Sequence, residues 1–498
     1  LDTVLNDYLI NSLLLLLGVG TGVILLGVPT AWLTSMCSFP GRRWLSWALL
    51  LPLAMPAYII AYTYSGLLDF AGPVQTWIRD LTGLSYGAYW FFEIRSLGGA
   101  IIMMSLVLYP YVYLLARAAF LEQSVSSIEV GCSLGYSRWQ ALWKLALPMA
   151  RPAIIAGLSL ALMETLADYG TVQYYGVSTF TTGIFRTFYG YGDTAAAAQL
   201  AASLLAFVIL LVLLERYSRR RARYHSAAES RARADLIPLS GSKAIMACVI
   251  CLSPLMFGFI IPATQLLFWA VFEAEPLGWD FVGLAWNSFS LAFLAAIIAV
   301  TLAIILSYAK RTKPIKPVRT VLAMAGFGYA LPGTIIAIGV LIPLAWLDHR
   351  LIDIFGSLGW DSPGLLLSGS LVALLFAYTV RFLAVALGSV QSGLEKIKPS
   401  LDHVGRSMGH SPLDILRKIH VPLMRSSILT AVLIVFVDVL KELPATLILR
   451  PFNFNTMAVR AYELASDERL VDAAPASIMI VLVGLIPVLM LHASIARR

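Results

Sequence analysis

Runs of about 20 apolar residues recur along this chain of 498 residues and constrain its fold more than any other feature. As a helix, each run is long enough to cross a hydrocarbon core about 30 Å thick. Backbone hydrogen bonds must be satisfied internally in lipid, which favours helices for these runs. Charged residues make up only 13 % of the chain, against about 25 % in soluble proteins. The sequence therefore predicts an all-α integral membrane protein.

The apolar runs and the charges between them predict the number and the orientation of the spans. Eleven spans are expected, at 9–33, 44–67, 98–119, 149–170, 197–215, 245–271, 288–309, 320–346, 366–388, 423–446 and 474–494. Of the 36 Lys and Arg residues, 24 lie in the loops of one side or at the C-terminus, so that side is predicted to be cytoplasmic. This orientation leaves Leu1 outside, and we expect a preceding helix that the sequence does not include, for a total of about 12.

One polar loop occurs twice with the same spacing. Residues 129–148 contain Glu129-Val130-Gly131, Gly135 and Pro148, and residues 403–422 contain His403-Val404-Gly405, Gly409 and Pro422, each 274 positions later. Further matches, at offsets of 274 or 276, pair Asn11 with Asn287, Ser12 with Ser288, Pro56 with Pro332, Glu164 with Asp438, Asp168 with Glu442, Thr182 with Thr456 and Arg186 with Arg460. The repeat predicts two halves of the same orientation, 1–215 and 244–498.

A basic segment, residues 216–243, is expected to join the two halves on the cytoplasmic side. Its cluster of Arg216, Arg219, Arg220, Arg221 and Arg223 either binds anionic lipid headgroups or fixes the topology as part of a flexible linker.

Each copy of the repeated loop has the pattern of a docking surface for a cytoplasmic partner. Gly135 and Gly409 are expected to adopt positive φ and to end one helix so that the next leaves at an angle. Pro148 and Pro422 suit the first turn of the membrane helix that follows, where no N–H is needed. Glu129 offers a carboxylate to a basic partner.

The loops at 122–148 and 390–422 resemble the coupling loop of ATP-binding-cassette importer permeases. That pattern is Glu-Ala-Ala, three residues, Gly, nine residues, Ile, one residue and Leu-Pro. The resemblance implies an importer transmembrane domain of two fused halves, with two copies of a separate ATPase subunit that bind ATP and dock on the loops. Val130-Gly131 and Val404-Gly405 replace the alanine pair here, and His403 replaces the second acidic residue, with Asp402 one position earlier as its possible substitute.

A narrower resemblance concerns residues 163–188 and 438–446, which are similar to the fused permeases of ferric-iron importers. It implies a protein of the bacterial inner membrane that moves iron(III) delivered by a periplasmic binding protein. Alternatives are the same architecture for thiamine or an oxyanion, or a secondary carrier without an ATPase. A secondary carrier would have no use for the paired docking loops.

Two pairs of carboxylates inside predicted spans are candidates for the translocation pathway. Glu164 and Asp168 are one helical turn apart, and Asp438 and Glu442 repeat this spacing in the second half. Ionisable groups are costly in a membrane and usually face a cavity, a partner or a pathway, and oxygen ligands suit a hard cation. We expect the two pairs to face each other near the axis; the alternative is a structural role, in which Lys441 neutralises a carboxylate.

Several chemistries have no motif in this sequence. It contains no phosphate-binding Gly-x-x-x-x-Gly-Lys-Ser/Thr, no His-Glu-x-x-His and no paired Cys-x-x-Cys. We therefore predict that the chain is not an enzyme, binds no cofactor tightly and has no certain metal site. The net charge of +8 is concentrated between the spans, so no nucleic-acid partner is expected.

Overall fold

The computed structural model describes residues 4–85, 88–122, 135–137, 140, 142–220, 236–276, 278–362 and 364–496. The chain forms two compact units, each described by itself. Unit 1 comprises Leu1–Gly192, Ala202–Ala274 and Leu464–Arg498, and unit 2 comprises Asp193–Ala201 and Glu275–Glu463.

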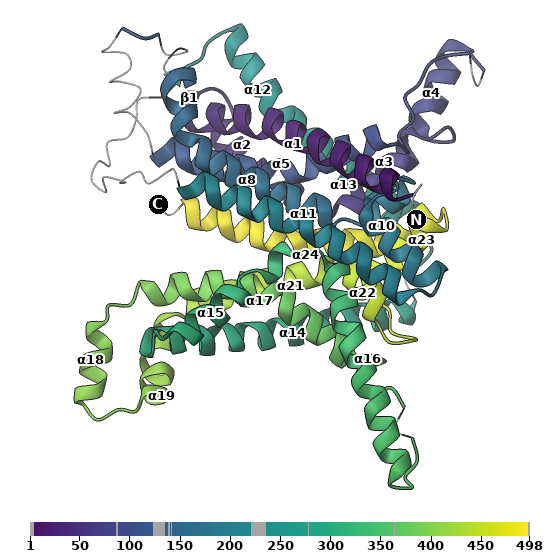
Figure 1. The fold of residues 1–498 in the computed structure, drawn as a ribbon. Coiled ribbons are helices and arrows are strands. Elements are labelled where there is room, and N and C mark those ends of the chain that lie inside the picture. Colours follow the sequence, from purple (N-terminus) through teal and green to yellow (C-terminus); the bar gives the residue numbers. More distant parts are fainter. Residues whose placement is uncertain are drawn as a thin grey trace. The chain divides into compact units, whose positions relative to one another are not determined.

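Unit 1 is built on three long helices that pack on one another, α1 (Val4–Met36), α5 (Leu97–Glu122) and α8 (Leu147–Ala167) (Figure 1). Glycines bring their backbones close together. A Cβ added to Gly27 of α1 would lie 3.0 Å from the carbonyl oxygen of Tyr109, and one added to Gly157 of α8 would lie 2.7 Å from that of Tyr111. Helices in lipid have no hydrophobic driving force for association, and small residues let their backbones pack closely instead. These glycines therefore allow α1, α5 and α8 to pack as the core of unit 1.

The other elements of unit 1 surround this core. They are β1 (Cys37–Ser38), which pairs in parallel with β2 (Ile237–Pro238), then α2 (Arg42–Ala48), the 3-10 turn η1 (Leu51–Ala54), α3 (Ala57–Leu68), α4 (Pro73–Thr82), the π turn η2 (Leu142–Ala146), α9 (Gly170–Tyr174), α10 (Phe180–Phe185), η3 (Arg186–Gly190), α12 (Ser242–Leu255), η4 (Met256–Ile260), α13 (Ile261–Phe268), η5 (Trp269–Glu273) and α24 (Leu470–Ala496). The helix α11 (Thr194–Arg220) begins in unit 2 and ends in unit 1.

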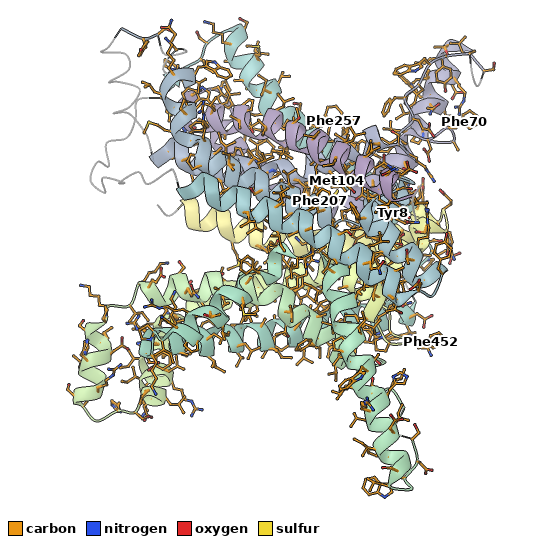
Figure 2. All side chains as sticks on the ribbon, viewed as in Figure 1. Tyr8, Phe70, Met104, Phe207, Phe257 and Phe452 are labelled. Atoms are coloured by element: carbon orange, nitrogen blue, oxygen red, sulfur yellow. The ribbon has the colours of Figure 1, made fainter. Side chains whose placement is uncertain are left out.

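Aromatic contacts hold the short helix α10 in unit 1. The ring of Phe180 lies 6.5 Å from that of Tyr8 on α1 and 5.5 Å from that of Phe207 on α11, centroid to centroid, and the last two side chains are labelled in Figure 2. Rings at such separations attract one another, so α10 is tied to both long helices.

Unit 2 is built on α14 (Trp279–Thr312), α17 (Leu371–Glu395) and α21 (Arg425–Lys441), which pack on one another. Buried alanines at a spacing of three or four form the inner face of α14: Ala292, Ala295, Ala296, Ala299 and Ala303. The remaining elements are α15 (Lys316–Ala325), η6 (Gly328–Ala330), α16 (Gly333–Ser357), α18 (Ser400–Ser407), α19 (Pro412–Ile415), the π turn η7 (Leu416–His420), α20 (Val421–Leu423) and α22 (Pro444–Leu449). The helix α23 (Met457–Ser466) closes unit 2.

The described residues contain nine helices long and apolar enough to cross a membrane, and up to 11 spans if each of two bent helix pairs counts as one. The predicted spans 44–67 and 320–346 are each broken rather than continuous. Met55 and Leu331 are extended, because a residue before proline avoids the helical region, and Pro56 and Pro332 are the N-cap residues of α3 and α16. The bend at the first break is 91°.

The compact units do not coincide with the two sequence halves. The segment 242–273 and α24, from the second half of the sequence, both lie in unit 1. There the hydroxyl of Tyr64 donates to the carbonyl oxygen of Phe257 at 2.7 Å, and the hydroxyls of Tyr62 and Ser477 are hydrogen-bonded. These segments cover helices that come from the first half.

Corresponding hydrogen bonds correct part of the sequence repeat. The Asn11 amide donates to the carbonyl of Ser178 at 3.0 Å, and the Asn287 amide donates to that of Asn455 at 3.5 Å. The two acceptors, Ser178 and Asn455, are 277 residues apart in the sequence. The same offset makes Thr179 the counterpart of Thr456. The matches of Thr182 with Thr456 and of Arg186 with Arg460 are therefore wrong, because residues inserted before α23 shift the register.

Candidate functional site

The second copy of the repeated loop is a helix–turn–helix formed by α18, Gly409 and α19. Gly409 has a φ of +79°, and its N–H donates to Arg406 while the N–H of His410 donates to Gly405. These two bonds form the Schellman motif that ends a helix at a left-handed residue. The prediction of positive φ is confirmed at Gly409 and at Gly135, where φ is +87°.

A second glycine, which the sequence analysis did not single out, sets the packing of this loop. Gly405 is buried, and a Cβ there would lie 2.9 Å from Cγ1 of Ile415 on α19. The sequence signal for this close packing was the glycine in His403-Val404-Gly405, which stands where the family pattern has alanine.

The prolines of the two loops follow π turns. Pro148 is the second residue of the helix that follows η2, and Pro422 is the second residue of the helix that follows η7, so each lies in the first turn of the next helix, as predicted. In unit 2 that next helix is only the short α20, and the chain bends by 77° before α21 crosses the unit. Pro422 therefore precedes the bend rather than opening the long helix. Glu129 lies outside the described residues.

Asp402 points into its own loop and His403 is exposed. A side-chain oxygen of Asp402 accepts from Nε of Arg311 at 2.8 Å, and Nη2 of the same arginine lies 2.6 Å away. Arg311 also donates to the carbonyls of Leu394 and Ile397, at 2.7 and 2.9 Å. Asp402 is only 8 % exposed, so an ion pair from it to a partner would first require the release of Arg311.

The imidazole of His420 closes the same cluster. Its Nε2 lies 2.8 Å from the second oxygen of Asp402, although the direction of approach is not that of a hydrogen bond. The hydroxyl of Tyr308 on α14 donates to the carbonyl of Pro412 at 2.6 Å. Together these contacts fix α18 and α19 against the end of α14 and the end of α17.

Asp168 and Glu442 have the same structural role in the two units. Asp168 follows α8, and its carboxylate accepts from the N–H of Thr171 at 3.0 Å and from that of Val172 at 3.3 Å. Glu442 follows α21 and accepts from the N–H groups of Ala445 and Thr446, each at 3.1 Å. Both carboxylates thus cap the first turn of a short helix, α9 or α22, where negative charge is favourable.

The other member of each predicted carboxylate pair lies one turn earlier. Glu164 is partly exposed on α8, and no ion pair of its side chain occurs within the described ranges. Asp438 on α21 lies 3.8 Å from the ammonium group of Lys441. The expectation that the pairs face each other concerns both units together and stays a prediction.

A buried arginine in unit 2 was missed by the sequence analysis. Arg381 on α17 is 8 % exposed, and its Nη1 lies 3.4 Å from Oε1 of Glu442, which is 5 % exposed. It is the single charged residue of the predicted span 366–388, and a charge inside a span was the signal that could have found it. At the corresponding position of the first half, 274 residues earlier, stands Val107.

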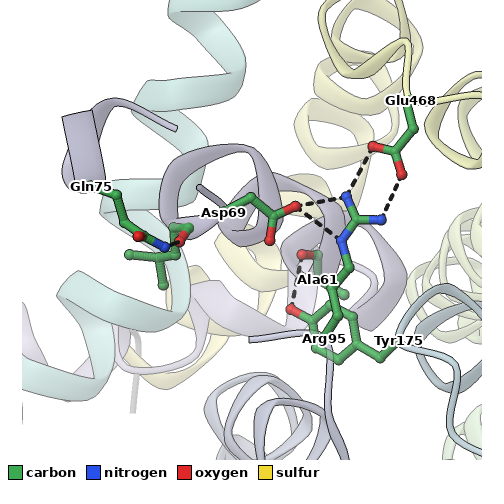
Figure 3. A network of polar contacts seen from close by, with 7 residues as sticks. Ala61, Asp69, Gln75, Arg95, Tyr175 and Glu468 are labelled. Atoms are coloured by element: carbon green, nitrogen blue, oxygen red, sulfur yellow. Dashed lines mark hydrogen bonds and ion pairs between the residues drawn. The ribbon is translucent and has the colours of Figure 1, made fainter. Parts of the chain in front are cut away.

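Unit 1 carries a polar network at the ends of three segments (Figure 3). The guanidinium of Arg95 lies 2.7 Å from the carboxylate of Asp69 after α3 and 2.5 Å from that of Glu468 before α24, and it covers the ring of Tyr174 on α9. The hydrogen bond from Arg95 lowers the pKa of Glu468 below its ordinary value. The network ties α3, α9 and α24 together at one end of unit 1.

Comparison with known proteins gives the class of this chain. Residues 20–224 match the family of binding-protein-dependent transport system inner membrane components. With its long apolar helices and broken spans, the chain is similar to the multi-pass inner membrane permeases of ATP-binding-cassette importers, in agreement with the predicted resemblance.

Individual relatives show the fused architecture. The chain is 26 % identical to the Fe(3+)-transport system permease protein FbpB 2 of Haemophilus influenzae over 490 residues, 97 % of this chain and 89 % of the relative. It is also 26 % identical to the molybdenum transport system permease protein ModB of Escherichia coli, over 44 % of this chain and 99 % of the relative. The sulfate transport system permease protein CysT of Escherichia coli is 26 % identical over 39 % of this chain and 71 % of the relative. The ModB permease of Escherichia coli therefore matches along almost its whole length, yet covers less than half of this chain.

Proposed function

We propose that this chain is the membrane subunit of an importer for ferric iron. The observation that carries the proposal is the match to an Fe(3+)-transport permease along 97 % of the chain, whereas the molybdenum and sulfate permeases match less than half of it. A periplasmic binding protein would deliver the iron, which is cargo rather than a bound cofactor.

ATP hydrolysis belongs to a separate ATPase subunit, of which two copies dock on the loops around Gly135 and Gly409. Both glycines have the left-handed conformation that a helix–turn–helix of this kind requires, which supports a common role. Asp402 acts as a positioning residue in the second loop, since Arg311 holds its carboxylate inside, and His403 is the exposed residue. Glu129 supplies the carboxylate of the first loop.

The loops and the C-terminus lie in the cytoplasm in this proposal. The excess of Lys and Arg on that side supports the orientation. This orientation agrees with the structure of unit 1, in which the C-terminal ends of α1 and α24 lie at the same end as β1. The label of the N-terminus lies at the opposite end (Figure 1).

Within the membrane, Glu164 is the strongest candidate for contact with the cargo. Asp168 and Glu442 are occupied as helix caps, and Asp438 lies near Lys441, whereas Glu164 is partly exposed. A carboxylate oxygen suits a hard, highly charged cation.

An oxyanion is the second candidate substrate, because one observation favours it. The buried guanidinium of Arg381 is paired with Glu442 through Nη1, but its Nε has no hydrogen-bond partner among the described residues, and planar guanidinium groups bind oxyanions well. The relatives named for molybdenum and sulfate transport agree with this alternative.

Co-purification and ATPase stimulation test the proposal. The chain is expressed with and without a candidate ATPase subunit, and the assembled complex is given binding protein loaded with iron(III) or with molybdate. A stable complex whose ATP hydrolysis rises severalfold with the iron-loaded protein alone is expected. Stimulation by the molybdate-loaded protein alone would support the oxyanion instead, and the absence of any complex would support a secondary carrier.

A further inference from the structure

A basic surface at the end of α14 has no role in the proposed coupling mechanism. Lys310 lies in the last turn of the long helix α14, Lys313 follows the end of that helix, and Lys316 and Arg319 lie in the first turns of α15. All four side chains are exposed, and none forms an ion pair in the part of the chain that the structure describes. The neighbouring Arg311 differs, since Asp402 and two carbonyl groups engage it.

The surface has an unopposed positive charge. No Asp or Glu occurs in the sequence between Asp280 and Asp348, so no local carboxylate balances the four cations. Charges one turn apart on one helix repel each other by a few tenths of a kcal/mol, and they are stabilised by a bound anion. The four cations are therefore available to an anionic ligand from outside the chain.

The distribution of side chains around α15 indicates where an anionic ligand would lie. Its buried Leu322 faces inward, and α15 packs on α17. At 3.6 residues per turn, Lys316 and Arg319 lie on one flank of this helix, while Val321 and Met324 lie on the other. Val321 and Met324 are 48 % and 68 % exposed. A short helix with a cationic flank and an exposed apolar flank is suited to the boundary between headgroups and hydrocarbon.

The position along the chain agrees with that boundary. The surface directly follows the 34-residue apolar helix α14. It lies at the same end of unit 2 as the helix–turn–helix of α18 and α19, since Tyr308 and Arg311 of α14 contact Pro412 and Asp402. Clusters of four or more cations at this place next to a span attract anionic lipids.

We infer that Lys310, Lys313, Lys316 and Arg319 form a binding site for the headgroups of anionic phospholipids, with Val321 and Met324 against the acyl chains. Within the described residues of the first half, the segment at the corresponding position is not an equivalent surface. That segment holds Arg42 and Arg43, and Arg42 is bonded to the carbonyls of Thr34 and Ser35. The site does not depend on the identity of the transported substrate.

The test compares lipid binding by matched variants of the purified full chain. Native mass spectrometry gives the association constants of phosphatidylglycerol and phosphatidylcholine for the wild type, for Lys316→Gln with Arg319→Gln, and for Lys310→Gln with Lys313→Gln. Each cation near an anionic headgroup contributes about fivefold in affinity, so each double variant should lose about 25-fold for phosphatidylglycerol and little for phosphatidylcholine. High salt should reduce the wild-type preference.

The control removes the same charge from unit 1. Arg43→Gln with Lys243→Gln changes two exposed cations, and it should leave phosphatidylglycerol affinity within about fivefold of the wild type. Equal losses in all double variants would show a general charge effect and overturn the site. Displacement of the lipid by millimolar inorganic phosphate would identify a free phosphate site instead. Loss of the ATPase subunit with unchanged lipid preference would assign the surface to a protein partner, which also contradicts the inference.

Discussion

The guanidinium of Arg381 and the carboxylate of Glu442 form an ion pair in the interior of unit 2, with Nη1 and Oε1 3.4 Å apart. The same carboxylate caps α22, so the pair connects the middle of α17 with that short helix. In unit 1, Asp168 caps α9 in the same way, but Val107 stands where Arg381 would be. Among the described residues, an arginine therefore neutralises the capping carboxylate of the second half, and no arginine is paired with Asp168.

Removing one partner of this pair should destabilise the protein strongly. Arg381→Met leaves Glu442 buried without its cation, which typically costs about 3–5 kcal/mol. Glu442→Gln leaves Arg381 without its carboxylate, and the double variant should recover part of the loss because no charge stays unpaired. Thermal unfolding of the purified chain in detergent measures all three. Strictly additive losses would mean that the two residues do not interact.

Gly333 makes this ion pair possible. A Cβ at Gly333 would lie 2.3 Å from Oε1 of Glu442 and 2.5 Å from Nη1 of Arg381, so Gly333→Ala should separate the two groups. The expected loss is about 1–3 kcal/mol, the usual cost of overpacking. The first half has Ala57 at the corresponding position, and Ala57→Gly is the control, with an expected effect below about 1 kcal/mol. Similar melting temperatures for Gly333→Ala and the wild type would contradict the steric argument.

The left-handed glycines of the two loops should be essential for coupling. Valine at Gly409, where φ is +79°, costs about 1–2 kcal/mol of backbone strain and distorts the turn between α18 and α19. Gly135→Val with Gly409→Val should reduce ATP-driven transport while membrane insertion stays normal. Gly388→Ala is the control, because it lies in α17 without positive φ and with open space around it. Wild-type transport in the double valine variant would remove these loops from the coupling step.

The two loops should differ in how their acidic residues act. Glu129→Ala should weaken ATPase docking more than His403→Ala, by up to about 1 kcal/mol, since His403 offers no carboxylate. Asp402→Ala should also impair coupling, because it releases α18 from Arg311. Co-purification with the ATPase subunit at low and high salt measures these differences. A salt-dependent loss for Glu129→Ala and a salt-independent loss for Asp402→Ala would distinguish docking from positioning.

The network around Arg95 should make unit 1 sensitive to acid. Arg95 lowers the pKa of Glu468 below 4.5, so the stabilisation is fully present above that pH and is lost as the pH falls through the lowered value. Glu468 is more than half exposed, which limits the effect to less than about 1 kcal/mol. Glu468→Gln should therefore destabilise the protein slightly at neutral pH and reduce the difference from the wild type near pH 3. A constant difference in melting temperature across this range would contradict the assignment.

Much of the fold could be predicted from apolar length and loop charge, because lipid leaves few alternatives to a helix. The breaks before Pro56 and Pro332 were overlooked since the apolar pattern continues through them, although each proline marks an extended residue before it. The positive φ of Gly135 and Gly409 followed from local turn chemistry. The sequence alone could not show that the second half's last helix packs in unit 1, because that depends on packing between distant segments.

The candidate site could be predicted less well, for a physical reason. The side chain of Asp402 faces inward because of Arg311, a residue 91 positions away in the sequence. Asp168 and Glu442 as members of a cation pathway stay a prediction, and the sequence did not show that backbone N–H groups three and four residues later bind their carboxylates as caps. Local spacing identifies such residues and does not show which neighbour will bind them.

Transport of iron by the reconstituted complex tests the central proposal most directly. Proteoliposomes containing the chain and its ATPase subunits are given binding protein loaded with radioactive iron(III), with molybdate as the competing cargo, and uptake is measured per assembled complex. We predict ATP-dependent uptake of iron, no uptake of molybdate, and a loss of about tenfold or more in Glu164→Gln with the complex intact. Uptake of molybdate without iron, or uptake of iron without ATP, would contradict the proposal.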